Sequence, residues 1–79
     1  MRVLLQHPPV ASEPARFVQL SLEQDLLGGW ALVREAGQLG GRSQLRREQF
    51  LERDEAVAAF EKAREQQVRR GFQPVADAP

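Results

Sequence analysis

The chain lacks cysteine and tyrosine, and it has a single histidine and a single tryptophan among its 79 residues. Without cysteine there can be no disulfide and no thiolate metal ligand, which favours a reducing compartment, and we expect the cytoplasm. The lone histidine, His7, precedes two prolines and has no serine or carboxylate companion at a defined spacing. Carboxylates are spread along the chain rather than grouped. We therefore expect no catalytic residue, no metal site, no cofactor and no enzyme activity.

An excess of charge of one sign is also lacking, because 11 Lys and Arg residues balance 11 Asp and Glu residues. A neutral chain has no long-range attraction to phosphate, so any binding of nucleic acid requires a local basic patch. Long apolar runs are missing too. The short run near the start stops at Pro8, far short of a membrane span or the apolar region of a signal peptide. We expect no membrane association.

Alternating or β-prone runs predict four strands, at residues 2–5, 16–23, 30–34 and 42–50. In the second run Val18, Leu20 and Leu22 share one face, as expected of a half-buried strand. The third run is apolar on both faces, which predicts an interior strand, and Trp30 at its start is expected in the core. The glycine-rich stretch 36–41 is expected to form a loop.

A long helix is predicted over residues 53–70, which are rich in alanine, glutamate and arginine and contain no proline or glycine. Ala56, Phe60 and Ala63 recur at three- and four-residue spacing and give one narrow apolar stripe. Acids at its start and bases at its end complement the helix dipole, and Gly71 can end it as a left-handed cap. Such a helix is expected to cover one face of a sheet.

These elements predict one α+β domain over residues 1–75, in which one long helix packs across a twisted antiparallel sheet of about four to five strands. A further short strand can come from residues 72–75, which can instead tuck Phe72 beneath the helix end. Residues 76–79 are expected to form a disordered tail. The length allows a single domain, and we expect a monomer.

The ordered combination RFVQLSLEQDLLGGWALVREAGQLGGRSQ, a long helix and then RRGF resembles the WGR domain family. The resemblance runs from Arg2 to Phe72, and it is closest to small bacterial proteins made of this domain alone, which implies a bacterial source. The family is named after the tripeptide tryptophan, glycine, arginine. The aligned residues here are Ala36, Gly37 and Gln38, so the tryptophan and the arginine are replaced.

In DNA-dependent poly(ADP-ribose) polymerases, WGR domains bind beside a strand break, and the signature tryptophan packs against the terminal nucleotide. The resemblance therefore implies a non-enzymatic module that binds DNA ends or nicks. Stacking on an aromatic side chain contributes about 1–3 kcal/mol, and a charged hydrogen bond about 1.5–3 kcal/mol. With Ala36 and Gln38 at the signature positions, we expect such binding to be weak.

The expected nucleic-acid site lies in the third and fourth runs and the loop between them, and it comprises Arg34, Gly37, Gln38, Arg42, Arg46 and Arg47. The arginines form the local basic patch that the neutral chain requires, and glycines can let backbone amides approach a phosphate. A second interpretation stays open for each group. Exposed arginines can merely protect a strand edge, and the glycines can simply close a hairpin.

A function of another class is a protein–protein interaction module that has lost nucleic-acid binding, in which the hairpin loop or a sheet edge docks a partner chain. This alternative requires an exposed apolar patch around Ala36, Leu39 and Leu45, and it fails if those residues are buried.

Overall fold

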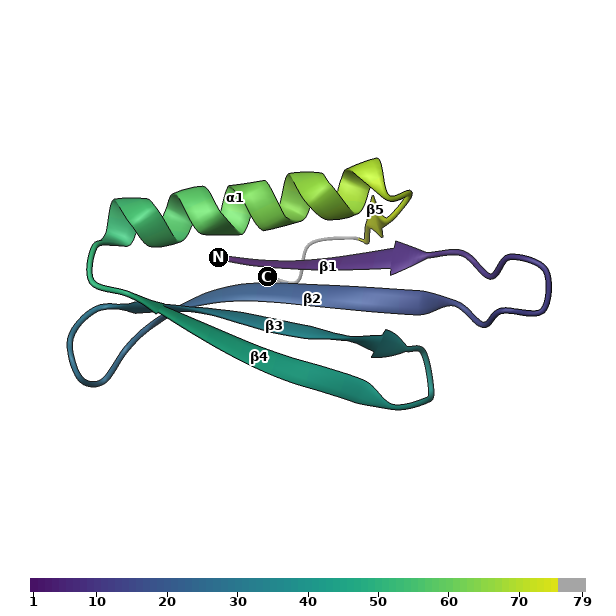
Figure 1. The fold of residues 1–79 in the computed structure, drawn as a ribbon, viewed down its shortest axis with the longest axis horizontal. Coiled ribbons are helices and arrows are strands. Elements are labelled where there is room, and N and C mark those ends of the chain that lie inside the picture. Colours follow the sequence, from purple (N-terminus) through teal and green to yellow (C-terminus); the bar gives the residue numbers. More distant parts are fainter. Residues whose placement is uncertain (76–79) are drawn as a thin grey trace.

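An antiparallel sheet with one helix on one face forms the fold (Figure 1). The computed structural model describes residues 1–75, so the tail predicted for residues 76–79 lies outside the described residues. The elements are β1 (Arg2–His7), β2 (Arg16–Gln24), β3 (Trp30–Gln38), β4 (Ser43–Phe50), α1 (Arg53–Arg69) and β5 (Gln73–Pro74). The five strands lie in the order β4-β3-β2-β1-β5. The predicted α+β architecture is confirmed.

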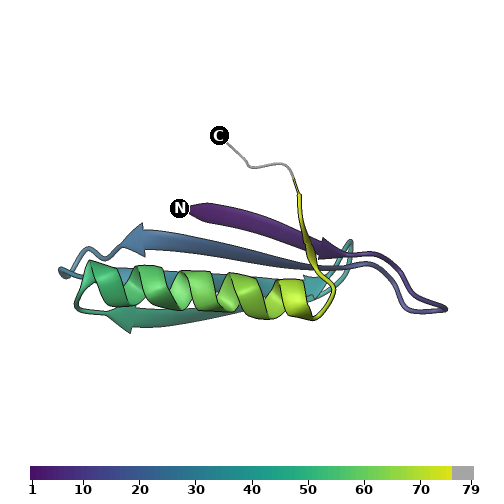
Figure 2. The same cartoon turned by 90° about the horizontal axis from the view of Figure 1, so that it is seen from above.

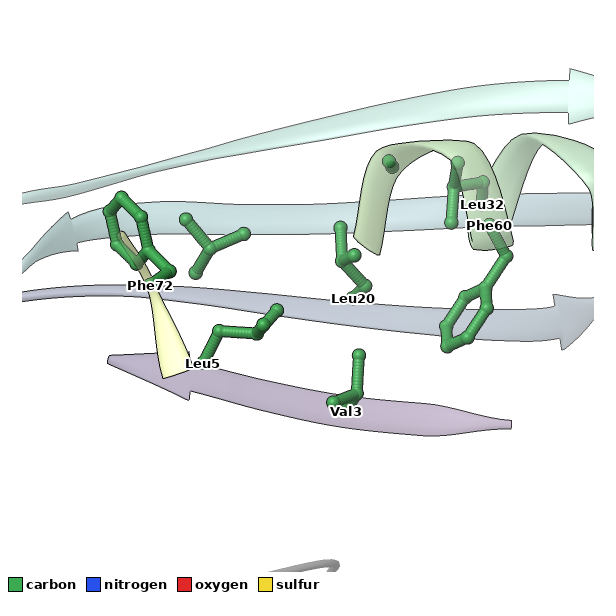
Figure 3. Close-up of a cluster of buried hydrophobic side chains, with 8 residues drawn as sticks. Val3, Leu5, Leu20, Leu32, Phe60 and Phe72 are labelled. Carbon is green, nitrogen blue, oxygen red and sulfur yellow. The ribbon is translucent and has the colours of Figure 1, made fainter. Parts of the chain in front are cut away.

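The core forms where the apolar face of the sheet meets α1, because residues at alternate positions of a strand share a face. Leu20 of β2 pairs with Val3 of β1, and Val18 pairs with Leu5. Leu5 and Leu20 are fully buried. These side chains form one buried cluster with Phe60 of α1 and Phe72, and Figure 3 shows the two phenylalanines at opposite ends of the cluster.

The buried stripe of α1 is narrow, as predicted, and consists of Ala56, Phe60, Ala63 and Gln67. At the end of the helix the backbone N–H of Phe72 donates to the carbonyl oxygen of Gln67, and that of Gly71 donates to Val68, at 3.0 Å each. Gly71 has a φ of 95°. This left-handed cap turns the chain back, so that Phe72 is buried beneath the helix end and β5 then pairs with β1.

Two local predictions need correction. The third strand continues to Gln38 instead of ending in a loop, so Ala36 and Gly37 pair with both neighbouring strands and Gln38 pairs with β2. Ladder pairing along a central strand outweighs the local preference of glycine. Trp30 is partly buried at the end of the sheet, outside the buried cluster, where the guanidinium carbon of Arg53 lies 5.5 Å from its ring centroid. The indole is covered from one side by a cation rather than packed in the core.

The sheet twists beneath a straight helix, and this mismatch sets the shape of the molecule. Figure 1 shows α1 close to β4 where the chain passes from one to the other, and the two elements diverge toward the C-terminal end of the helix. Figure 2 shows from above that α1 follows the strands along the sheet. β4 is exposed from Ser43 to Gln49. The divergence leaves one end of the helix-side face uncovered.

No helix within residues 1–75 is long and apolar enough to cross a membrane.

Replacing Leu20 with alanine tests the placement of the core. Leu20 is fully buried beneath α1, so Leu20→Ala is expected to lower the free energy of unfolding by about 2–5 kcal/mol. Leu26→Ala is the matched control, because Leu26 is 101% exposed in the turn between β2 and β3, and its effect is expected to stay within about 0.5 kcal/mol. Urea denaturation measures both, and equal losses would contradict the proposed core.

Candidate nucleic-acid interface

Two arginines lie directly opposite each other on the helix-side face of the sheet. Arg34 of β3 pairs with Arg46 of β4, and Leu20 on the other side of Arg34 belongs to the core. Like charges at directly opposed positions destabilise a sheet. Among residues 1–75 the only ion pair joins Arg47 to Glu23. Arg34 and Arg46 therefore hold two uncompensated positive charges side by side.

These two arginines line a cleft of about 530 Å³ at the end where α1 and the sheet diverge. Its floor is the sheet, one wall is the end of α1, and the other wall is the connection between β1 and β2. The surface contains arginines, one acid, apolar groups and amides, and we call it the arginine cleft: His7, Pro8, Val10, Glu13, Pro14, Arg16, Val18, Arg34, Ala36, Gln44, Arg46, Gln67, Arg70 and Phe72. Four cations thus face one carboxylate, which makes the cleft electropositive in a neutral chain.

A second hollow adjoins the cleft at the turn between β3 and β4, and we call it the hairpin hollow. It shares Arg16 and several neighbours with the arginine cleft, and it adds five residues: Gly37, Gln38, Gly41, Arg42 and Ser43. The two hollows therefore form one continuous surface. Across both, Glu13 remains the one acidic side chain.

The structure divides the six residues expected from sequence among three places. Arg34 and Arg46 lie in the arginine cleft, whereas Gly37, Gln38 and Arg42 line the hairpin hollow. Arg47 follows Arg46 in the strand and therefore points to the opposite face. There its guanidinium lies 3.4 Å from the carboxylate of Glu23. Five of the six expected residues therefore line one continuous surface, and Arg47 does not.

Two further arginines join the site from distant parts of the chain. Arg16 begins β2 and pairs with Gln38 at the end of β3. Arg70 follows the last turn of α1, which returns along the sheet to the same end. Sequence analysis missed both. Arg16 alternates with Val18 and Leu20 along β2 and so shares their face of the strand. This signal could have placed Arg16 on the helix side.

The glycine in the signature tripeptide has a structural role. A Cβ at Gly37 would collide with the carbonyl oxygen of Arg42 and with the backbone of Ser43. The neighbouring amides are also occupied, because the N–H of Gln38 donates to Arg42 at 3.2 Å and that of Gly41 donates to Gln38 at 3.0 Å. These two amides close the hairpin and are not free to bind a phosphate.

The apolar residues of the alternative interpretation are separated. Leu39 and Leu45 are 46% and 67% exposed, so they are not buried. Ala36, however, is on the helix-side face, while Leu45 pairs with Glu35 on the opposite face. The three residues therefore do not form one docking patch. Within the described part of the chain no three His, Asp or Glu side chains are grouped closely enough to hold a metal ion.

Comparison with known protein families agrees with this geometry. The chain matches the WGR domain over residues 1–79. It therefore belongs to the WGR domain family, a type of nucleic-acid-binding module without catalytic activity. Comparison with curated proteins and with solved structures gives no match.

The structural role of Gly37 can be tested with a matched pair of glycines. Gly37→Ala is expected to lower the free energy of unfolding by about 1–3 kcal/mol, because β3 and β4 must separate to admit the methyl group. In Gly41→Ala the new Cβ would lie 3.2 Å from the Cβ of Gln38, and a loss within about 1 kcal/mol is expected. Thermal denaturation compares the two, and a Gly37 variant as stable as wild type would contradict this role.

Proposed function

We propose that this WGR domain binds DNA ends or nicks weakly, through the arginine cleft and the hairpin hollow. The supporting observation is that five arginines converge on this surface, and none of them forms an ion pair within residues 1–75: Arg16, Arg34, Arg42, Arg46 and Arg70. Guanidinium groups donate bidentate hydrogen bonds to phosphate. Uncompensated arginines therefore favour a polyanion as the ligand.

The size of the arginine cleft supports the preference for an end. At about 530 Å³ it has the dimensions of a small-molecule site. It can receive the end of one strand between the end of α1 and the β1–β2 connection, but not the full width of a duplex. A nick or a blunt end exposes such a strand end, whereas an intact duplex does not.

Weak binding follows from the two altered signature positions. Ala36 lies at the junction of the two hollows and offers no aromatic surface for stacking. Gln38 lines the hairpin hollow with a neutral amide where a cation would bind phosphate. The remaining affinity is therefore electrostatic and falls steeply with added salt. We propose that the domain acts in the cytoplasm as a non-catalytic binding module and a monomer.

Adjacent arginines on opposite faces provide the test. Fluorescence anisotropy would compare nicked, blunt and intact duplexes at two salt concentrations. Arg46→Ala is expected to weaken binding to the nicked duplex about tenfold and to reduce the salt slope by about 1. Arg47→Ala is the control, because it removes the same charge from the opposite face, and its effect is expected to stay within about twofold.

Equal effects of Arg46→Ala and Arg47→Ala would contradict binding through the arginine cleft, since they would show that only total charge matters. Equal affinity for nicked and intact duplexes would refute the preference for ends. Tight duplex binding that does not respond to salt would contradict the electrostatic origin of the affinity.

A further inference from the structure

The side chain of one polar residue in the buried helix stripe forms no hydrogen bond within residues 1–75. Gln67 follows Ala56, Phe60 and Ala63 in the stripe and is only 6% exposed. Its side-chain amide forms no hydrogen bond within residues 1–75. In the same residues, every side-chain nitrogen or oxygen that is completely buried has a hydrogen-bond partner, so this amide is not completely buried. The amide therefore retains contact with solvent, and it does so in the arginine cleft, which Gln67 lines. An apolar side chain would fill this position of the stripe at lower cost.

The walls of the arginine cleft carry three kinds of chemistry. Arg34 and Arg46 supply positive charge from the sheet, and Arg70 supplies it from the end of α1. Pro8 and Val10, both exposed, supply an apolar surface from the β1–β2 connection. Gln67 supplies an amide that can donate and accept hydrogen bonds at once. The volume of about 530 Å³ lies within the range of about 300–1,000 Å³ typical of small-molecule sites.

We propose that the arginine cleft binds a free adenine mononucleotide. The phosphate contacts Arg34, Arg46 and Arg70, and the base packs on the apolar surface with its polar edge against the amide of Gln67. Adenine matches this amide because a glutamine side chain can pair with its exocyclic amine and a ring nitrogen simultaneously. This activity goes beyond the binding of DNA ends, since it requires no polynucleotide strand.

Ala36 provides the space for such a ligand. It lies on the floor between Val18 of β2 and Gln44 of β4, and its small side chain lines both hollows. A large side chain at this position would fill the arginine cleft from below without removing any arginine. Ala36→Trp therefore tests the position of the ligand, because it removes the space for a mononucleotide while every arginine stays in place.

Isothermal titration calorimetry with adenosine 5′-monophosphate, adenosine and inorganic phosphate tests the proposal. Wild type is expected to bind the mononucleotide, and to bind adenosine and phosphate each at least about tenfold more weakly, because each alone loses one class of contact. The side-chain amide signals of Gln67 in a nitrogen–proton NMR spectrum are expected to shift with the mononucleotide and not with phosphate.

Neighbouring glutamines give the matched variants. Gln67→Leu is expected to weaken binding of the mononucleotide about three- to tenfold, because the amide that pairs with the base is lost. Gln66→Leu is the control, since Gln66 is exposed, and no change is expected. Where Gln67→Leu fails to fold, Ala36→Trp is decisive, with loss of mononucleotide binding by a folded protein as the expected result.

Three results would overturn the proposal. Phosphate that binds as tightly as the mononucleotide would reveal a simple anion site. Unchanged affinity in Gln67→Leu would remove the role of the amide, and full mononucleotide binding by Ala36→Trp would place the ligand outside the cleft. Each of these results leaves the binding of DNA ends intact. Conversely, if the domain does not bind duplexes but still binds the mononucleotide, only the proposed binding of DNA ends is refuted.

Discussion

The site of this domain depends on the contact between a straight helix and a twisted sheet. α1 buries a narrow stripe that begins at the small residue Ala56, and it lies close to the strands near its start. The twist of the sheet then carries β4 away from the helix axis (Figure 1). The two layers can be in close contact at one end only. At the other end the gap becomes the arginine cleft, and the left-handed turn at Gly71 closes it off by bringing Phe72 beneath the helix.

The charged side chains differ between the helix-side face of the sheet and its open face. The chain is neutral overall, yet acids and bases are not mixed evenly over its surface. On the open face of the sheet Arg47 is balanced by Glu23. On the helix side Arg34 and Arg46 are directly opposed, and neither forms an ion pair among the described residues. A bound anion would relieve their mutual repulsion, so the ligand proposed for the cleft would also stabilise the fold.

The fold could be predicted from sequence because its signals are local. The alternation around Leu20 and the stripe around Phe60 each reveal a buried face from a few neighbouring residues. The site is harder to predict from sequence, because it depends on the register of the strands and on where the helix ends. That Arg46 and Arg47 face opposite ways follows from strand geometry alone, but which of them faces the cleft depends on the position of α1.

Long-range pairing explains the remaining differences. Arg16 reaches the site because β2 and β3 pair along their full length, which also extends β3 through a glycine that local preference assigns to a loop. Gln67 occupies a position of the predicted stripe, yet no local pattern shows that it borders a cleft. Trp30 carries the strongest local signal for a core, but its strand begins at the very end of the sheet, where no layer covers it fully.

The central claim is that anions bind on the helix side of the sheet, at the uncompensated arginines. The most direct measurement is a nitrogen–proton NMR titration that follows the arginine Nε–Hε signals as a nicked duplex is added. The signals of Arg34 and Arg46 are expected to shift first, while those of Arg47 and of Arg64, exposed on α1, stay in place. Shifts at Arg47 or Arg64 with none at Arg34 and Arg46 would contradict the account.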